Sequence, residues 1–312
     1  METVFLNSNN IVTNSQNSVL SFNFSSNVTF GKNTKIALKS VDMYYSWFNV
    51  SKNYNNNTFQ YKWWNSEGIL DDIFTVVIPD GNYSIDLINE ALQNEMVKNK
   101  HYVTDSSSGT NSAVYFLELI ANSTMYKFQM NCYYMPSLDE MNNGYKDYVK
   151  PVGATWSYPK DPNNTYDVIN FPESSPDSGS TPQVIIMNNE FSKLIGFKSG
   201  TYPSTLKTTK SSNIGELIPE IDPVSTMLVT CNLVNQKYAY PKNLLYGFSN
   251  NATQFGGVIS FEVNQYSWCN VSSGVYKNIS IQIYDQNYNS LNILDPQMTI
   301  ALIIDDSEAI YE

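Results

Sequence analysis

The chain of 312 residues is long enough for one or two compact domains, each with a sizeable buried core. Aromatic residues make up 14% of the sequence and charged residues only 15%, a balance that favours a mainly β protein with broad packed surfaces over a helical bundle. The net charge of −11, the absence of arginine and the lack of any basic run argue against phosphate-binding enzymes and against nucleic acid as a partner.

Four segments near the start of the chain have the pattern of β-strands. Residues 19–30 alternate apolar and polar side chains, with Leu20, Phe22 and Phe24 on one face. Residues 35–50 begin with the same alternation and end in an aromatic run, which predicts a long strand that is bent or bulged. Residues 58–64 and 74–78 complete this early group.

A helix is predicted after the turn at Pro79-Asp80-Gly81, beginning near Ser84. Four apolar side chains follow at helical spacing on one face: Ile85, Ile88, Leu92 and Met96. This is the only strong helix signal in the sequence, and it separates the early strands from a later group. We therefore predict one β-sandwich that is interrupted by an insertion.

The sequence between the helix and residue 222 mixes short strands with polar connections. Residues 114–120 and 125–134 predict two strands joined by a turn, and residues 184–187 predict another. Residues 189–196 predict one or two helical turns that end at a glycine. Residues 136–182 are short of aliphatic side chains and rich in Pro, Asn, Asp, Ser and Tyr, which predicts either an ordered excursion or a mobile loop.

Five more strands, separated by turn residues, are predicted in the last third of the chain. They lie at residues 226–234, 243–249, 257–263, 277–284 and 297–304. Four early and five late strands predict a single jelly roll, with two four-stranded sheets and an extra edge strand. We place this discontinuous domain at residues 1–79 and 223–312. The insertion, a second β-rich domain that carries one helix, is placed at residues 80–222.

Cysteine usage and the N-terminus indicate a soluble protein that is made inside a cell. Cys132, Cys231 and Cys269 are too few and too widely spaced for a disulfide framework, so we expect buried free thiols. The N-terminus lacks the pattern of a signal peptide, and Asn-x-Ser/Thr tripeptides such as that at Asn49 are therefore expected to be chance matches. No apolar run approaches the roughly 20 residues that a membrane helix needs, so no membrane association is expected.

No residue pattern supports catalysis, a cofactor or a metal site. His101 is the only histidine, and its polar surroundings predict a solvated loop residue. The acid pairs Asp71-Asp72 and Asp305-Asp306 are adjacent in sequence, which favours solvated turn residues over the two facing carboxylates of a glycoside hydrolase. The sequence has no cluster of metal ligands and no glycine loop that would bind phosphate. We predict that the chain is not an enzyme.

Clusters of aromatic residues are the candidate functional feature. They comprise Tyr44, Tyr45, Trp47 and Phe48, then Trp63 and Trp64, and finally Tyr133 and Tyr134. Packing in a core explains them most simply, and an assembly interface, where Tyr and Trp are enriched, is the main alternative. A stacking surface for sugars is the third.

Five segments carry a resemblance to a known family. They are residues 44–51 (YYSWFNVS), 78–92 (IPDGNYSIDLINEAL), 191–197 (FSKLIGF), 229–234 (VTCNLV) and 279–291 (ISIQIYDQNYNSL). In this order they resemble the penton, or minor capsid, proteins of virophages and Polinton-like viruses, in particular those of the mavirus type. The resemblance spans about residues 18 to 305 and consists of structural signatures rather than a catalytic motif.

The resemblance implies a structural virion protein. Such a protein would form homopentamers at the fivefold vertices of an icosahedral capsid and contact the double-jelly-roll major capsid protein. It would be made in the host-cell cytoplasm or virus factory and carry an inserted outer domain. Two other functions stay open at this point: a receptor- or carbohydrate-binding spike module, since jelly rolls also form lectins, and a glycoside hydrolase.

Overall fold

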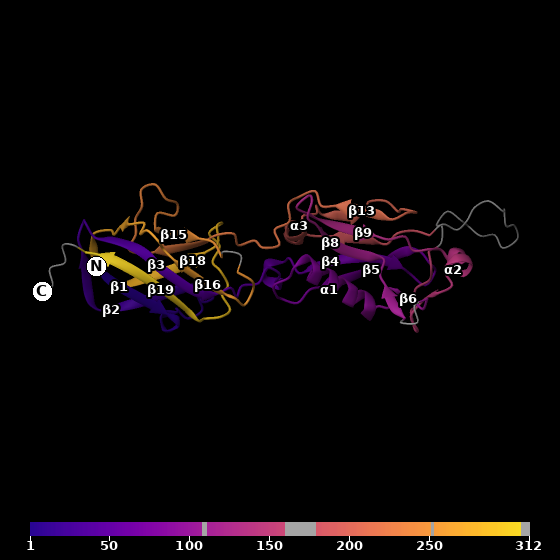
Figure 1. Ribbon diagram of the computed structural model, residues 1–312, viewed down its shortest axis with the longest axis horizontal. Helices are drawn as coiled ribbons and strands as arrows, with labels where there is room; N and C mark the ends of the chain where they lie inside the picture. Colours follow the sequence, from indigo (N-terminus) through magenta and orange to yellow (C-terminus); the bar gives the residue numbers. More distant parts are fainter. Residues whose placement is uncertain (108–110, 160–178, 251–252, 307–312) are drawn as a thin grey trace. The chain divides into compact units, whose positions relative to one another are not determined.

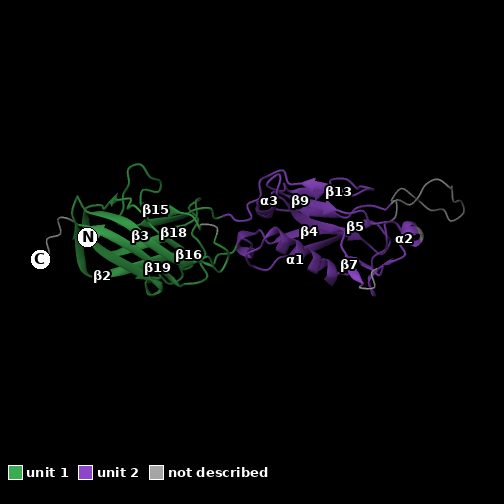
Figure 2. Cartoon of the chain, in the orientation of Figure 1, with its two compact units in different colours: residues 1–48, 224–312 green, residues 49–223 purple. Residues whose placement is uncertain are grey.

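The chain divides into two units, which Figure 2 colours separately. The computed structural model describes residues 1–107, 111–159, 179–250 and 253–306. The first unit comprises Met1–Phe48 and Val224–Glu312, and the second comprises Asn49–Pro223. Strands make up most of the regular structure in both units, which confirms the mainly β class.

Two antiparallel sheets form the first unit (Figure 1). The first sheet contains, in spatial order, β1 (Glu2–Asn7), β19 (Met298–Asp305), β3 (Lys35–Tyr44) and β16 (Val258–Glu262), and the short β17 (Cys269–Asn270) also pairs with β3. The second sheet contains β15 (Leu244–Phe248), β14 (Met227–Cys231), β18 (Gly274–Tyr284) and β2 (Val19–Phe30). The 3-10 helix η1 (Ser8–Asn10) follows β1.

The order of these strands is that of an eight-stranded jelly roll. Without the short β17, the strands of the unit are β1, β2, β3, β14, β15, β16, β18 and β19 in chain order. Strands that follow one another along the chain mostly lie in different sheets, so the chain winds around the core as a jelly roll does. The second unit is inserted between β3 and β14, the third and fourth strands of this series.

Side chains from both sheets meet in one hydrophobic core. Leu6, Ile36 and Ile300 enter it from the first sheet, and Leu20 and Val229 from the second. Strand β18 illustrates the cause, because its alternation places Ile279, Ile281 and Ile283 in the core and leaves Ser280 and Gln282 on the outside. The five predicted late strands are confirmed as β14, β15, β16, β18 and β19.

Strand β1 is absent from the predicted set. It pairs along its whole length with β19, from Glu2 opposite Ile304 to Asn7 opposite Thr299. Only three apolar residues stand between its polar ends, which is too short a pattern to indicate a strand by itself. Its partner lies at the other end of the sequence, so no local signal could reveal the pairing.

The described residues of the second unit form three small antiparallel sheets. The largest has the order β12 (Gly200–Tyr202), β11 (Gln183–Ile186), β4 (Thr58–Trp64) and β5 (Leu70–Val77). The second sheet has the order β13 (Ser211–Ile214), β9 (Lys127–Cys132) and β8 (Leu117–Asn122). The third has the order β10 (Tyr148–Val149), β6 (Val103–Asp105) and β7 (Ser112–Val114). The 3-10 helix η2 (Lys52–Tyr54) precedes β4.

Strands β4 and β5 explain why the domain boundary differs from the prediction. We place the boundary near residue 79 from sequence, whereas the second unit begins at Asn49. β4 pairs with β11, far along the chain, and its Phe59, Tyr61 and Trp63 are buried in the core of the second unit. The alternating pattern of these strands identifies them as strands but carries no information about the sheet that they join.

Helix α1 (Ile85–Lys98) forms where the sequence predicts it. The hydroxyl of Ser84 accepts a hydrogen bond from the backbone N–H of Leu87 and caps the helix. The predicted face, Ile85, Ile88, Leu92 and Met96, is buried in the core of the second unit. On the same helix, the side chain of Asn89 accepts a hydrogen bond from the backbone of Leu119 in β8.

Two further α-helices in the described residues correct the prediction of a single helix. Helix α3 (Asn189–Ile195) corresponds to the predicted helical turns and ends at Gly196, whose φ of 74° favours glycine. Helix α2 (Leu138–Gly144) is capped by Ser137 and lies in the segment predicted as irregular. Residues 160–178 of that segment lie outside the described residues.

Candidate functional site

The eight aromatic residues nominated from sequence divide between the two units. Tyr45 and Trp47 are buried in the core of the first unit, with ring centroids 4.4 Å apart. Trp63 and Trp64 are buried in the core of the second. Tyr44 and Phe48 of the first unit and Tyr133 and Tyr134 of the second are half-buried, so an interface role stays a prediction for these four.

His101 is buried in the second unit, contrary to the prediction of a solvated residue. Its ring stacks on Trp63 at a centroid distance of 4.9 Å, and its Nδ1 lies 2.9 Å from the hydroxyl of Tyr61. Burial lowers the pKa of the imidazole from 6.5 to about 3. The neighbouring lysines and asparagine in the sequence favour a solvent-exposed position, but the side chain of His101 is buried against the aromatic side chains of β4.

Acid should destabilise the second unit through His101. Between pH 6.5 and 3 the unfolded chain binds a proton at this residue and the folded chain does not, so the free energy of unfolding should fall by about 1.4 kcal/mol per pH unit as the pH drops. Urea unfolding at pH 7 and pH 5 measures this slope. A His101→Phe variant should be less stable at pH 7 but show a smaller loss between the two pH values, and equal slopes would contradict the prediction.

The acidic residues and cysteines considered from sequence do not come together in a functional site. Asp71 and Asp72 lie in β5 and are exposed, and Asp305 ends β19. Cys132, Cys231 and Cys269 are buried free thiols, as predicted. Within the described ranges, no group of three His, Cys, Asp or Glu residues is placed to hold a metal ion. None of the described helices has the length and apolar character needed to cross a membrane.

The second sheet of the first unit is nearly free of charge. Its four strands contain one charged residue, Lys277, at the bulge of β18. Its half-buried outward side chains at the centre are Ser21, Ser280 and Gln282, which we call the uncharged face, and the buried Thr230 lies beside them. The strands of the first sheet, by contrast, carry six charged residues: Glu2, Lys35, Lys39, Asp42, Glu262 and Asp305.

Hydrogen bonds from side chains of the second sheet cross-link its strands at the uncharged face. The hydroxyl of Thr230 donates to the carbonyl of Gln282 across the β14–β18 pair, and the amide of Asn278 donates to the hydroxyl of Ser21 across the β18–β2 pair. Charged residues are depleted at the centre of protein–protein interfaces, and the uncharged face has that composition.

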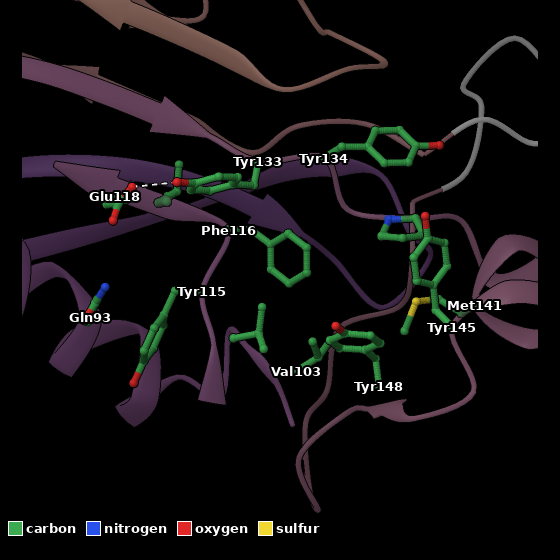
Figure 3. Close-up of a pocket in the computed structure, with 13 residues that line it drawn as sticks. Gln93, Val103, Tyr115, Phe116, Glu118, Tyr133, Tyr134, Met141, Tyr145 and Tyr148 are labelled. Atoms are coloured by element: carbon green, nitrogen blue, oxygen red, sulfur yellow. Dashed lines mark hydrogen bonds between the residues drawn. The ribbon is translucent and has the colours of Figure 1, made fainter. Parts of the chain in front are cut away.

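An aromatic cavity of about 480 Å³ lies in the second unit (Figure 3). Six of the thirteen residues that line it are aromatic: Tyr115, Phe116, Tyr133, Tyr134, Tyr145 and Tyr148. Met141 of α2, Gln93 of α1 and Glu118 of β8 also line it. In Figure 3, Gln93 and Glu118 lie at one end with Tyr115 and Tyr133, whereas Tyr134, Tyr145 and Tyr148 lie toward the other.

Strand pairing positions the polar end of the cavity. Glu118 lies opposite Asn131 in the β8–β9 pair, and the ladder continues to a hydrogen bond from the backbone of Tyr133 to that of Phe116. The carboxylate oxygen Oε2 of Glu118 accepts hydrogen bonds from the Tyr133 hydroxyl at 2.6 Å and from the Asn131 amide at 2.9 Å. Burial, reinforced by Glu118, raises the pKa of Tyr133 to about 12, so the hydroxyl stays protonated.

The other end of the cavity is fixed in a similar way. The hydroxyl of Tyr134 donates to the carboxylate of Glu140, and the backbone N–H of Gly179 donates to the Tyr134 hydroxyl at 2.8 Å. The rings of Tyr145 and Tyr148 pack edge to face, 6.1 Å apart. The sequence singles out only Tyr133 and Tyr134, because the other tyrosines come from separate elements that meet only in the fold.

Comparison with solved structures finds virophage proteins. The mavirus penton protein aligns over 97% of this chain and 98% of its own, with 13% identity and a TM-score of 0.38. A chain of the Sputnik virophage, solved by cryo-EM, aligns over 98% of both chains, with 11% identity and a TM-score of 0.36. The first of these is a penton protein of the mavirus type, the kind of protein that the five sequence segments resemble. No protein-family model and no curated protein matches the sequence.

Proposed function

We propose that the chain is a penton-type minor capsid protein, which forms homopentamers at the fivefold vertices of a virion and contacts the major capsid protein there. The strand order of the first unit is the observation that carries the proposal, because the jelly roll is a fold of viral capsid proteins. The sequence resemblance to virophage pentons supports it. In this role the protein acts by assembly and not by catalysis.

The uncharged face is the surface that we assign to the contact between subunits. Each copy carries a net charge of −11, so five copies repel one another unless their contacts run over surfaces with few charges. The second sheet of the first unit offers such a surface on a stiff, hydrogen-bonded scaffold. In a closed ring it would form one side of a head-to-tail contact, with a different surface of the neighbouring subunit as the other side.

The native mass of the purified full chain, measured by native mass spectrometry over a range of concentration and salt, tests the proposal. We expect a pentamer, and a Ser280→Lys variant that folds normally but forms at least about tenfold less pentamer, because an unpaired ammonium would be buried in the contact. Thr299→Lys is the matched control: it places the same charge on the outer side of the first sheet and should leave the pentamer intact.

Two outcomes would contradict the proposal at different levels. A stable trimer would favour the spike module over the penton. Pentamers that form equally well with Ser280→Lys would leave the penton in place and remove the uncharged face from the contact.

A further inference from the structure

We propose that the aromatic cavity of the second unit binds a neutral saccharide of one or two rings. The proposal concerns the second unit alone and does not depend on pentamer assembly. At about 480 Å³ the cavity falls in the size range of small-molecule sites. Its lining combines broad apolar ring faces with hydroxyl groups at their edges, so a matching ligand would have apolar faces and a polar rim.

A sugar ring has this distribution of polarity. Its C–H groups form apolar patches that can stack on the tyrosine faces, and its hydroxyl groups project around the edge. The side chains of Tyr115 and Tyr148 are half-buried, which leaves ring surface accessible from the cavity. The tilted contact between the rings of Tyr102 and Tyr115, with centroids 6.1 Å apart, supports the Tyr115 ring from outside the lining.

The polar end supplies hydrogen-bonding groups for the sugar hydroxyls. Glu118 uses Oε2 for both of its hydrogen bonds, and among the described residues none is formed by its Oε1 or by the side chain of Gln93. The carboxylate is held in place through Asn131, which is itself buried and accepts a hydrogen bond from Ser212 at 2.9 Å. A positioned carboxylate with one unused oxygen is a strong acceptor for a sugar hydroxyl.

Other ligand classes fit the cavity less well. Among the described residues that line the cavity, none is cationic, so Glu118 would repel an anion such as a sialic acid. A purely apolar ligand would take the carboxylate out of water without replacing its lost hydrogen bonds. A compact organic cation would satisfy the carboxylate but fill only part of the volume, and one face of Tyr133 already has the Lys210 ammonium 4.5 Å from its centroid.

Saturation-transfer NMR on the full chain tests the proposal with defined probes. The neutral set is glucose, galactose, mannose, N-acetylglucosamine and lactose, with sialyllactose as the anionic comparison and choline as the cationic one. We expect saturation transfer to at least one neutral sugar, and weaker or no transfer to sialyllactose and choline. Transfer to none of the neutral sugars, or to choline alone, would overturn the proposal.

Variants locate the binding site. Glu118→Gln and Tyr148→Ala should each raise the Kd for the neutral sugar at least about tenfold, by loss of the charged acceptor and of a stacking surface respectively. Tyr126→Ala is the matched control, because Tyr126 is an exposed tyrosine of the same unit that does not line the cavity. Thermal unfolding confirms that each variant is folded. Wild-type affinity in both folded cavity variants would overturn the assignment to this cavity.

Discussion

Replacing Trp47 with Asp should prevent the first unit from folding. The indole is only 2% exposed, packs against Tyr45 and belongs to the jelly-roll core. The substitution leaves a void and buries a carboxylate, with an expected cost of at least about 5 kcal/mol, comparable to the whole stability of a domain. Soluble yield and thermal unfolding of the purified chain measure the effect.

The conservative variant Trp47→Phe separates packing from charge. No group within the described residues accepts a hydrogen bond from Nε1 of Trp47, so the indole contributes through packing alone. A phenyl ring keeps most of that packing and removes a buried donor without a partner, so we expect a loss of no more than about 2 kcal/mol. Normal unfolding and normal pentamers from Trp47→Asp would contradict the prediction for this residue.

The sequence predicts elements well wherever one side of an element is buried. Ile279, Ile281 and Ile283 repeat every second residue because β18 has one face in the core, and the apolar face of α1 repeats at helical spacing for the same reason. The repeats of β18 and α1 could be read without knowing any partner. Four early and five late strands predict the jelly roll; the late strands, β2 and β3 lie in it, whereas β4 and β5, the other two early strands, belong to the inserted unit.

Features that depend on distant partners could not be predicted. Strands β4 and β5 belong to the inserted unit because β4 pairs with β11, and β1 is a strand because β19 lies beside it. His101 is buried by Trp63 and Phe74, which come from other strands. Alternation identifies a strand and its buried face, but it does not specify which strand lies next to it.

The uncharged face and the aromatic cavity also depend on residues that are distant in sequence. Ser280 and Gln282, the outward residues at the centre of β18, are uncharged in sequence, but the significance of this appears only when β2, β14 and β15 lie in the same sheet and extend the uncharged surface. The cavity is harder to predict still, since its tyrosines come from β10 and from segments that flank β7, β9 and α2. Each of these tyrosines alone resembles an ordinary half-buried or exposed aromatic residue.

Asn49 joins the two ends of the inserted unit. It is the first residue of the unit and is 3% exposed. Its side-chain amide donates to the carbonyl of Tyr83 at 2.8 Å and to that of Ile221, near the end of the unit, at 2.6 Å. Its Oδ1 accepts from the backbone N–H of Tyr83 at 2.8 Å. Both amide hydrogens are used inside the fold, so the Asn49 tripeptide cannot accept a glycan in the folded protein.

Replacing Asn49 with Asp should therefore destabilise the second unit by about 4 kcal/mol at pH 7, because a buried carboxylate would face two carbonyl oxygens that have lost their donors. Repulsion and burial would raise the pKa of the new carboxyl in the folded state, so its unfavourable effect grows as the pH rises through that pKa and shrinks toward pH 4. Urea unfolding of the variant and of the wild type at pH 7 and at pH 4 gives the difference between their free energies of unfolding at each pH. His101 contributes equally to both proteins, so its contribution cancels in this difference. Asn53→Asp makes the same chemical change at an exposed position in the 3-10 helix η2 and should cost less than about 0.5 kcal/mol. A loss that is equal for the two variants, or independent of pH, would mean that the amide of Asn49 does not hold the ends of the unit together.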